Sequence, residues 1–207
     1  MSVLSNYMGR FDYEQFISEI SWKKGEHDTT WTVDDKEVIY YYTDNGYEKI
    51  NEALRNEIIK NNSFNINTLV NMNGEIQLAE EITSVIKKTP PSDYEFVYRW
   101  ENSIIRNINT LEIDDIIGYQ SFVSTSIDSE FTFYNRMEIK IKISEPIGVF
   151  IASYSKYSDE KELLIDKNSF FIVKNIDLKN KEIHLQHISK EDDISHLVNK
   201  NGNEGVV

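Results

Sequence analysis

Two glutamates one residue apart, Glu160 and Glu162, are the residues whose type and spacing first suggest chemistry. They lie in the stretch YSKYSDEKELLI, where a polar segment becomes an apolar strand. Alternate side chains of a strand share one face, about 7 Å apart, so we expect both carboxylates to point the same way and one pKa to be raised. One such group can stabilise a developing positive charge and the other can take a proton. The alternative is that these residues are an ordinary charged triplet on a solvated strand edge, without a role in chemistry.

Further polar residues precede this pair. Tyr98–Arg99 ends an apolar strand, and an STS sequence follows Phe122 and Val123. Arginine offers a forked set of donors to an anion, so Arg99 is a candidate anion-binding residue and Arg136 is a second one. For Arg99 the alternative is an ion pair at the edge of the core. Phe133, three residues before Arg136, is a further candidate, and for it the alternative is an ordinary core position. The candidate positions in this part of the chain are Tyr98, Arg99, Ser124, Thr125, Ser126, Phe133 and Arg136.

In this order and at these separations, the motifs resemble those of the mono-ADP-ribosyltransferases of the Arg–Ser–Glu class. This group contains the actin-modifying bacterial toxins and the C3-like exoenzymes. Its members carry an aromatic–Arg pair on the first core strand, an S-T-S strand, and E-x-E or Q-x-E after a mobile loop. The stretch Tyr41–Arg55 also resembles the helical entry of these domains. Trp100 departs from the second arginine of the actin toxins, and Ser121 departs from their asparagine, which puts the target in doubt.

The resemblance implies that NAD is the co-substrate and that no metal is needed. Arg99 and Arg136 would hold the pyrophosphate, and Phe133 would pack beside the nicotinamide. Glu162 would stabilise the charge that develops on the ribose as the nicotinamide leaves, and Ser124 would hold its carboxylate. Tyr98, Thr125 and Ser126 complete the implied NAD site; strand hydroxyls without a role are the alternative for Thr125 and Ser126.

The resemblance also implies an acceptor. Family members with glutamine at the position of Glu160 modify asparagine or other acceptors, so glutamate there points to arginine on a target protein. Glu160 would orient the guanidinium and take its proton. The loop SKYSD would meet the target, with Tyr157 as a recognition residue; a tyrosine packed on the domain is the alternative. Actin or a small GTPase is the substrate class that the resemblance implies.

Composition narrows the possible functions. The chain has 207 residues, of which 22 are basic and 35 acidic, and its net charge of −13 argues against a nucleic-acid partner. The absence of cysteine excludes disulfides, zinc–thiolate sites and a cysteine nucleophile. The four histidines have no metal-ligand spacing, and neither a dinucleotide-binding glycine motif nor a P-loop is present. We expect no signal peptide and no membrane span.

Hydrophobic periodicity changes half-way along the chain. Apolar residues recur at helical spacing around residues 11–20, 47–58 and 74–88, and the prolines of TPPSDYE stop the last helix. Short segments rich in β-branched and aromatic residues follow, including the strictly alternating RMEIKIKIS. Helices before strands predict an α+β fold. We expect a single domain over 1–207, with a helical layer over about 1–90, a mixed β-sandwich core over about 91–189 with the NAD cleft between two small sheets, and a polar tail over 190–207.

These observations predict an ADP-ribosyltransferase that transfers ADP-ribose from NAD to a protein arginine. An NAD glycohydrolase and an inactive binding module of the same fold remain the alternatives. We expect a monomeric toxin or effector that is secreted or translocated without a classical signal peptide. A phage-encoded protein that acts in the cytoplasm is the alternative location.

Overall fold

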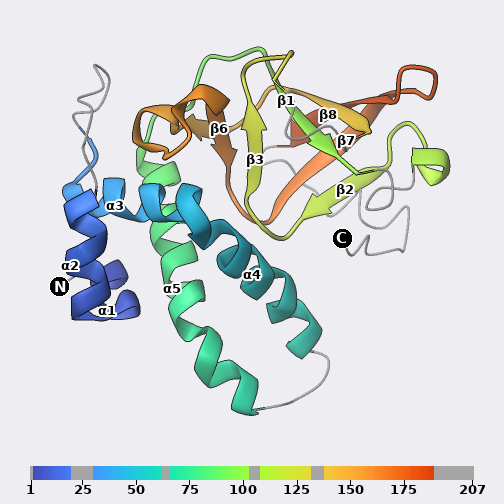
Figure 1. Cartoon of the computed structure of the whole chain (residues 1–207). Coiled ribbons are helices and arrows are strands. Elements are labelled where there is room, and N and C mark those ends of the chain that lie inside the picture. The colour runs from blue at the N-terminus through green and yellow to red at the C-terminus, as the bar shows by residue number, and fades with distance from the viewer. Residues whose placement is uncertain (1, 20–29, 62–65, 103–107, 132–137, 189–207) are drawn as a thin grey trace. The chain divides into compact units, whose positions relative to one another are not determined.

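The computed structural model describes residues 2–19, 30–61, 66–102, 108–131 and 138–188. The chain divides into two compact units (Figure 1). The first unit comprises Met1–Pro90 and Ile151–Asp159, and the second comprises Pro91–Phe150 and Glu160–Val207. Residues 151–159 therefore belong to the first unit, although the strands before and after them belong to the second.

The first unit is helical. Helices α4 and α5 lie side by side (Figure 1), and their apolar residues recur at helical spacing and are buried, as at Ile50 and Leu54 on α4 and at Ile82 and Val85 on α5. No helix of the described segments is long and apolar enough to cross a membrane. The elements of this unit are α1 (Val3–Met8), α2 (Arg10–Glu19), α3 (Val33–Tyr41), the π-helical turn η1 (Tyr42–Gly46), α4 (Tyr47–Asn61), α5 (Ile66–Lys88) and the 3-10 turn η3 (Ala152–Tyr154).

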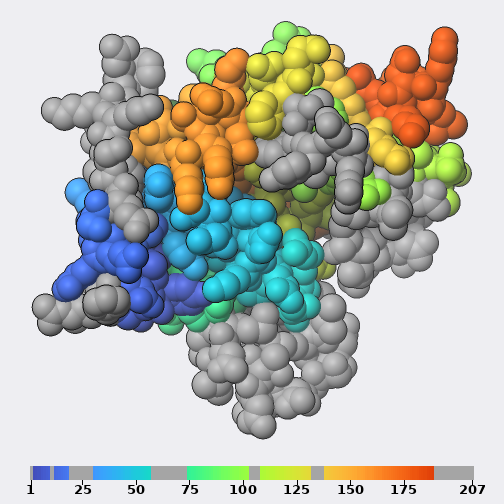
Figure 2. Space-filling model, in the orientation of Figure 1, coloured from blue at the N-terminus to red at the C-terminus, as the bar shows by residue number. Residues whose placement is uncertain are grey.

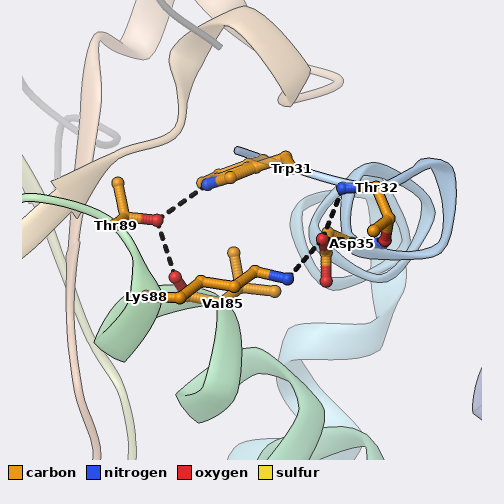
Figure 3. A network of polar contacts seen from close by, with 6 residues as sticks. All are labelled: Trp31, Thr32, Asp35, Val85, Lys88 and Thr89. Atoms are coloured by element: carbon orange, nitrogen blue, oxygen red, sulfur yellow. Dashed lines mark hydrogen bonds and ion pairs between the residues drawn. The ribbon is translucent and has the colours of Figure 1, made fainter. Parts of the chain in front are cut away.

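The start of α3 is tied to the end of α5. Thr32 caps α3 in a capping box with Asp35, whose carboxylate accepts from the Thr32 backbone N at 2.6 Å. Lys88, the last residue of α5, forms an ion pair with the same carboxylate. Trp31 Nε1 donates to Thr89 Oγ1 at 2.7 Å (Figure 3). These contacts fix the two helix ends together.

The second unit is built on a mixed sheet. The strand order is β2-β7-β8-β4-β1-β3-β6-β5, with β4 and β8 parallel and the other pairs antiparallel. The elements are β1 (Phe96–Glu101), the 3-10 turn η2 (Ile108–Thr110), β2 (Ile116–Tyr119), β3 (Val123–Ser126), β4 (Ile139–Ser144), β5 (Gly148–Phe150), β6 (Glu162–Ile165), β7 (Ser169–Asp177) and β8 (Glu182–Ile188). A further 3-10 turn, η4 (Ser158–Glu160), leads into β6.

The core of this unit lies on one side of each strand. In β4, Ile139, Ile141 and Ile143 are fully buried, whereas the intervening Lys140 and Lys142 are partly exposed. The same alternation on the other strands adds residues to one apolar cluster. Its members are Val97, Ile117, Tyr119, Val123, Ile139, Ile141, Ile143, Leu163, Ile165, Phe171, Val173, Ile183 and Leu185.

The α+β fold with helices before strands is confirmed. The sequence predicts two small sheets, whereas the structure joins the strands into one order in which β1 meets β3 at the register pair Tyr98–Ser126. The helix expected from Gly74 begins earlier, at Ile66, and ends at Lys88 before the prolines, as predicted.

Candidate functional site

Glu162 is a buried carboxylate on the first residue of β6. The β3–β6 register pairs Glu162 with Ser126, which places Ser124 diagonally across on the same face. Ser124 Oγ donates a hydrogen bond to Glu162 Oε1, and only 3% of the Glu162 surface is exposed. Burial raises the pKa of Glu162 to about 7, against the opposing effect of the Ser124 hydrogen bond; Glu160 raises this pKa further and Arg99 lowers it.

Glu160 occupies a different kind of backbone from Glu162. It ends the 3-10 turn η4, and Lys161 between the two glutamates has a left-handed φ of 48°. The strand begins only at Glu162, so the expectation that both carboxylates share one strand face is wrong. Glu160 is half-buried, and burial raises its pKa as well. The sequence predicts that repulsion within the pair raises one pKa, whereas burial is the largest cause at Glu162 and the cause at Glu160.

The turn after β3 holds the segment from Glu160 to Lys161. Ser126 Oγ donates to the backbone carbonyl of Glu160 at 2.7 Å, and the backbone N of Ile127 donates to that of Lys161 at 3.2 Å. Lys161 Nζ forms an ion pair with Asp128 at 2.9 Å. The yellow turn after β3 and the orange segment at the start of β6 adjoin at the surface (Figure 2). These bonds stabilise the left-handed turn that separates the two glutamates.

Arg99, on β1, contacts Ser124, the residue that donates to Glu162. Its Nη1 donates to the Ser124 carbonyl at 2.8 Å, and its Nε lies 3.0 Å from Glu101 Oε1. Tyr98, the neighbour of Arg99 on β1, pairs with Ser126 of β3. The bond from Arg99 to the Ser124 carbonyl therefore links β1 to β3 beside that pair. The ion pair proposed as the alternative for Arg99 is therefore present, yet 29% of the Arg99 side chain is exposed. Arg99, Ser124 and Glu162 are brought together, as the motifs predict.

The other predicted residues have varied positions. Tyr98 is half-buried, and its ring lies 6.4 Å from that of Trp100. Thr125 Oγ1 donates to the Leu163 carbonyl at 2.6 Å, on the core side of β3. Tyr157 belongs to the helical unit and is 48% exposed, so it is not packed into that unit. Phe133 and Arg136 lie outside the described residues.

Sequence reasoning did not identify Glu101 and Tyr119. Glu101 is only 4% exposed, and its Oε1 accepts from Arg99 and also from Tyr119 OH at 2.6 Å. The signal for Glu101 was its position two residues after Arg99, on the same side of the strand. No local pattern marks Tyr119, because it reaches Glu101 from β2.

The family model of the ADP-ribosyltransferase exoenzymes matches residues 9–196 of the chain. The chain belongs to this family. The resemblance to the ADP-ribosyltransferase toxins that the motifs suggest is thereby confirmed at the level of the family.

Solved structures of a toxin, an exoenzyme and an effector share the fold. The Vis toxin from Vibrio splendidus has 20% sequence identity and a TM-score of 0.60, over 92% of this chain and 86% of that one. The C3 exoenzyme of Clostridium limosum has 18% identity and a TM-score of 0.58, over 76% and 85% of the two chains. The type III effector XopAI from Xanthomonas axonopodis pv. citri has 15% identity and a TM-score of 0.59, over 86% and 67%.

A relative from Acanthamoeba polyphaga mimivirus, an uncharacterised protein, is 28% identical over 155 residues. The match covers 64% of this chain and 38% of the viral protein. The chain therefore spans well under half the length of that relative.

Proposed function

We propose that this chain transfers a single ADP-ribose from NAD to an arginine of a target protein and releases nicotinamide. The observation that carries the proposal is the hydrogen bond from Ser124 to the buried carboxylate of Glu162, with the Arg99 guanidinium on the carbonyl of the same serine. One residue thus links a cation suited to phosphate with an acid suited to a developing positive charge.

The NAD half of the reaction uses Arg99 and Glu162. The pyrophosphate of NAD is anionic and needs a local cation in a chain whose net charge is −13. Arg99 provides one, and its contacts hold the guanidinium in a fixed plane. When the bond between nicotinamide and ribose breaks, positive charge develops on the ribose, and an ionised Glu162 would stabilise it. A cationic substrate beside Glu162 also favours the ionised form of a carboxyl whose pKa is about 7.

The acceptor half uses Glu160. Arginine is protonated at neutral pH and is a poor nucleophile until a base removes a proton from it. A half-buried carboxylate with a raised pKa is a stronger base than an exposed one. Glu160 would orient the guanidinium and take its proton as the nitrogen bonds to the ribose carbon. The Vis structure with bound agmatine, a small guanidinium compound, supports an acceptor of this chemistry.

The natural target would be a protein of a host cell. Toxins and a translocated effector are among the proteins with the same fold, which supports a secreted or translocated toxin or effector. Actin or a small GTPase remains the target class implied by the motif resemblance. The exposed Tyr157, three residues before Glu160 in the chain, is our candidate for target recognition.

The test is the fate of ADP-ribose from NAD in the presence of agmatine. The purified protein should form ADP-ribosylagmatine and release an equal amount of nicotinamide. The Glu160→Gln variant should lose this product while it still releases nicotinamide and free ADP-ribose, because only the acceptor base is removed. An NAD glycohydrolase would instead give free ADP-ribose at the same rate with or without agmatine, and a binding module would give neither product.

A further inference from the structure

We infer that Glu101, supported by Tyr119, is a positioning residue that fixes the guanidinium of Arg99 for NAD. This inference rests on the proposed function, because it assigns a role only if Arg99 binds NAD. It concerns residues that neither the motifs nor the family comparison assign.

The geometry at Glu101 is that of a fixed support. One carboxylate oxygen, Oε1, accepts from Arg99 Nε at 3.0 Å and from Tyr119 OH at 2.6 Å. Burial of a carboxylate is costly unless the group is paired and hydrogen-bonded, and both neighbours meet that requirement here. The Tyr119 ring is itself oriented by an edge-to-face contact with Phe171, with centroids 5.5 Å apart at 87°.

These contacts determine the direction of the Arg99 donors. A guanidinium is planar and carries five N–H groups in a rigid fork. Bonds from Nε to Glu101 and from Nη1 to the Ser124 carbonyl fix that plane at two points. Arginine otherwise loses considerable rotamer freedom when it binds an anion. A side chain already held in its binding orientation loses less, so Glu101 should strengthen NAD binding through Arg99.

The test compares steady-state nicotinamide release by variants of Glu101. Glu101→Ala should raise KM for NAD about tenfold or more and change kcat by less than about threefold, because a binding contact is weakened. Glu101→Gln should restore KM to within about threefold of the parent, since its amide oxygen accepts both hydrogen bonds. Glu95→Ala, an exposed glutamate just before β1, is the control and should keep the parental KM.

A merely structural role predicts a different result. A partly unfolded variant has fewer active molecules, which lowers the apparent kcat and leaves KM unchanged. A parental KM in a folded Glu101→Ala variant, or a KM in Glu101→Gln as high as in Glu101→Ala, would overturn the inference. If Glu101→Ala does not fold, Glu101→Asp replaces it: the shorter carboxylate keeps its charge but not its reach, so KM should rise, and a parental KM would overturn the inference.

Two variants separate this inference from the proposed function. Arg99→Lys and Glu162→Gln should impair NAD cleavage in the same assay. If neither does so, the proposed function fails together with the inference. If both do so while the Glu101 variants keep the parental KM, the inference alone fails.

Discussion

The buried carboxyl of Glu162 should destabilise the folded protein at alkaline pH. Its replacement by glutamine should therefore raise the free energy of unfolding at that pH. Burial raises the pKa of Glu162 from 4.5 to about 7. Between these values the folded protein keeps a proton that the unfolded chain has released. The contribution of this carboxyl to stability is therefore greatest below about pH 4.5 and is lost as the pH rises through about 7. Glutamine is close in shape, can still accept from Ser124, and does not ionise.

The expected magnitude follows from the size of that pKa change. At about 1.4 kcal/mol per pKa unit, the Glu162→Gln variant should exceed the parent in unfolding free energy by about 1 kcal/mol at pH 5 and about 3 kcal/mol at pH 8. Urea denaturation of both proteins at the two pH values measures the difference. Glu95→Gln, at an exposed position, should show no such change. An advantage of equal size at both pH values, or none at pH 8, would refute this reasoning.

Three further predictions concern the site and its support. Ser124→Ala removes a hydrogen bond that lowers the pKa of Glu162, so the acid limb of the pH profile of kcat/KM for nicotinamide release, expected near pH 7, should move to higher pH; an unmoved limb would contradict this. Arg99→Lys loses the forked donor geometry and should weaken NAD binding about tenfold in calorimetry, and an unchanged affinity would exclude Arg99 from the NAD site. Asp35→Ala removes half of the capping box of α3 and the ion pair with Lys88, and should cost about 1–2 kcal/mol in urea unfolding, whereas a parental value would show that these contacts contribute little.

Much of the fold follows from periodicity. The alternation of isoleucine and lysine in β4 predicts a half-buried strand, and the structure places the isoleucines in the core. Helix α3 was missed because Asp35 and Glu37 interrupt its apolar pattern. Both side chains are buried because each has a polar partner, Lys88 for Asp35 and Tyr13 for Glu37. These partners lie in other parts of the chain, so the local sequence does not reveal them. The continuous strand order was missed because the register of β1 on β3 has no local signal in the sequence.

The candidate site was predictable as a set of residue types, but not in its geometry. The order of Arg99, Ser124 and Glu162 along the chain identified residues that the fold brings together. The left-handed φ of Lys161 is not visible in the sequence, because lysine rarely adopts it and the bonds that hold it come from the turn after β3. The role of Glu101 depends on Tyr119, which lies on another strand.

The most direct measurement is the rate of nicotinamide release from saturating NAD by the parent and by Glu162→Gln at pH 8. If the carboxylate held by Ser124 stabilises the charge on the ribose, the variant should be slower by about a hundredfold or more, while its affinity for NAD stays within about threefold of the parent. A variant that releases nicotinamide at the parental rate would contradict the account.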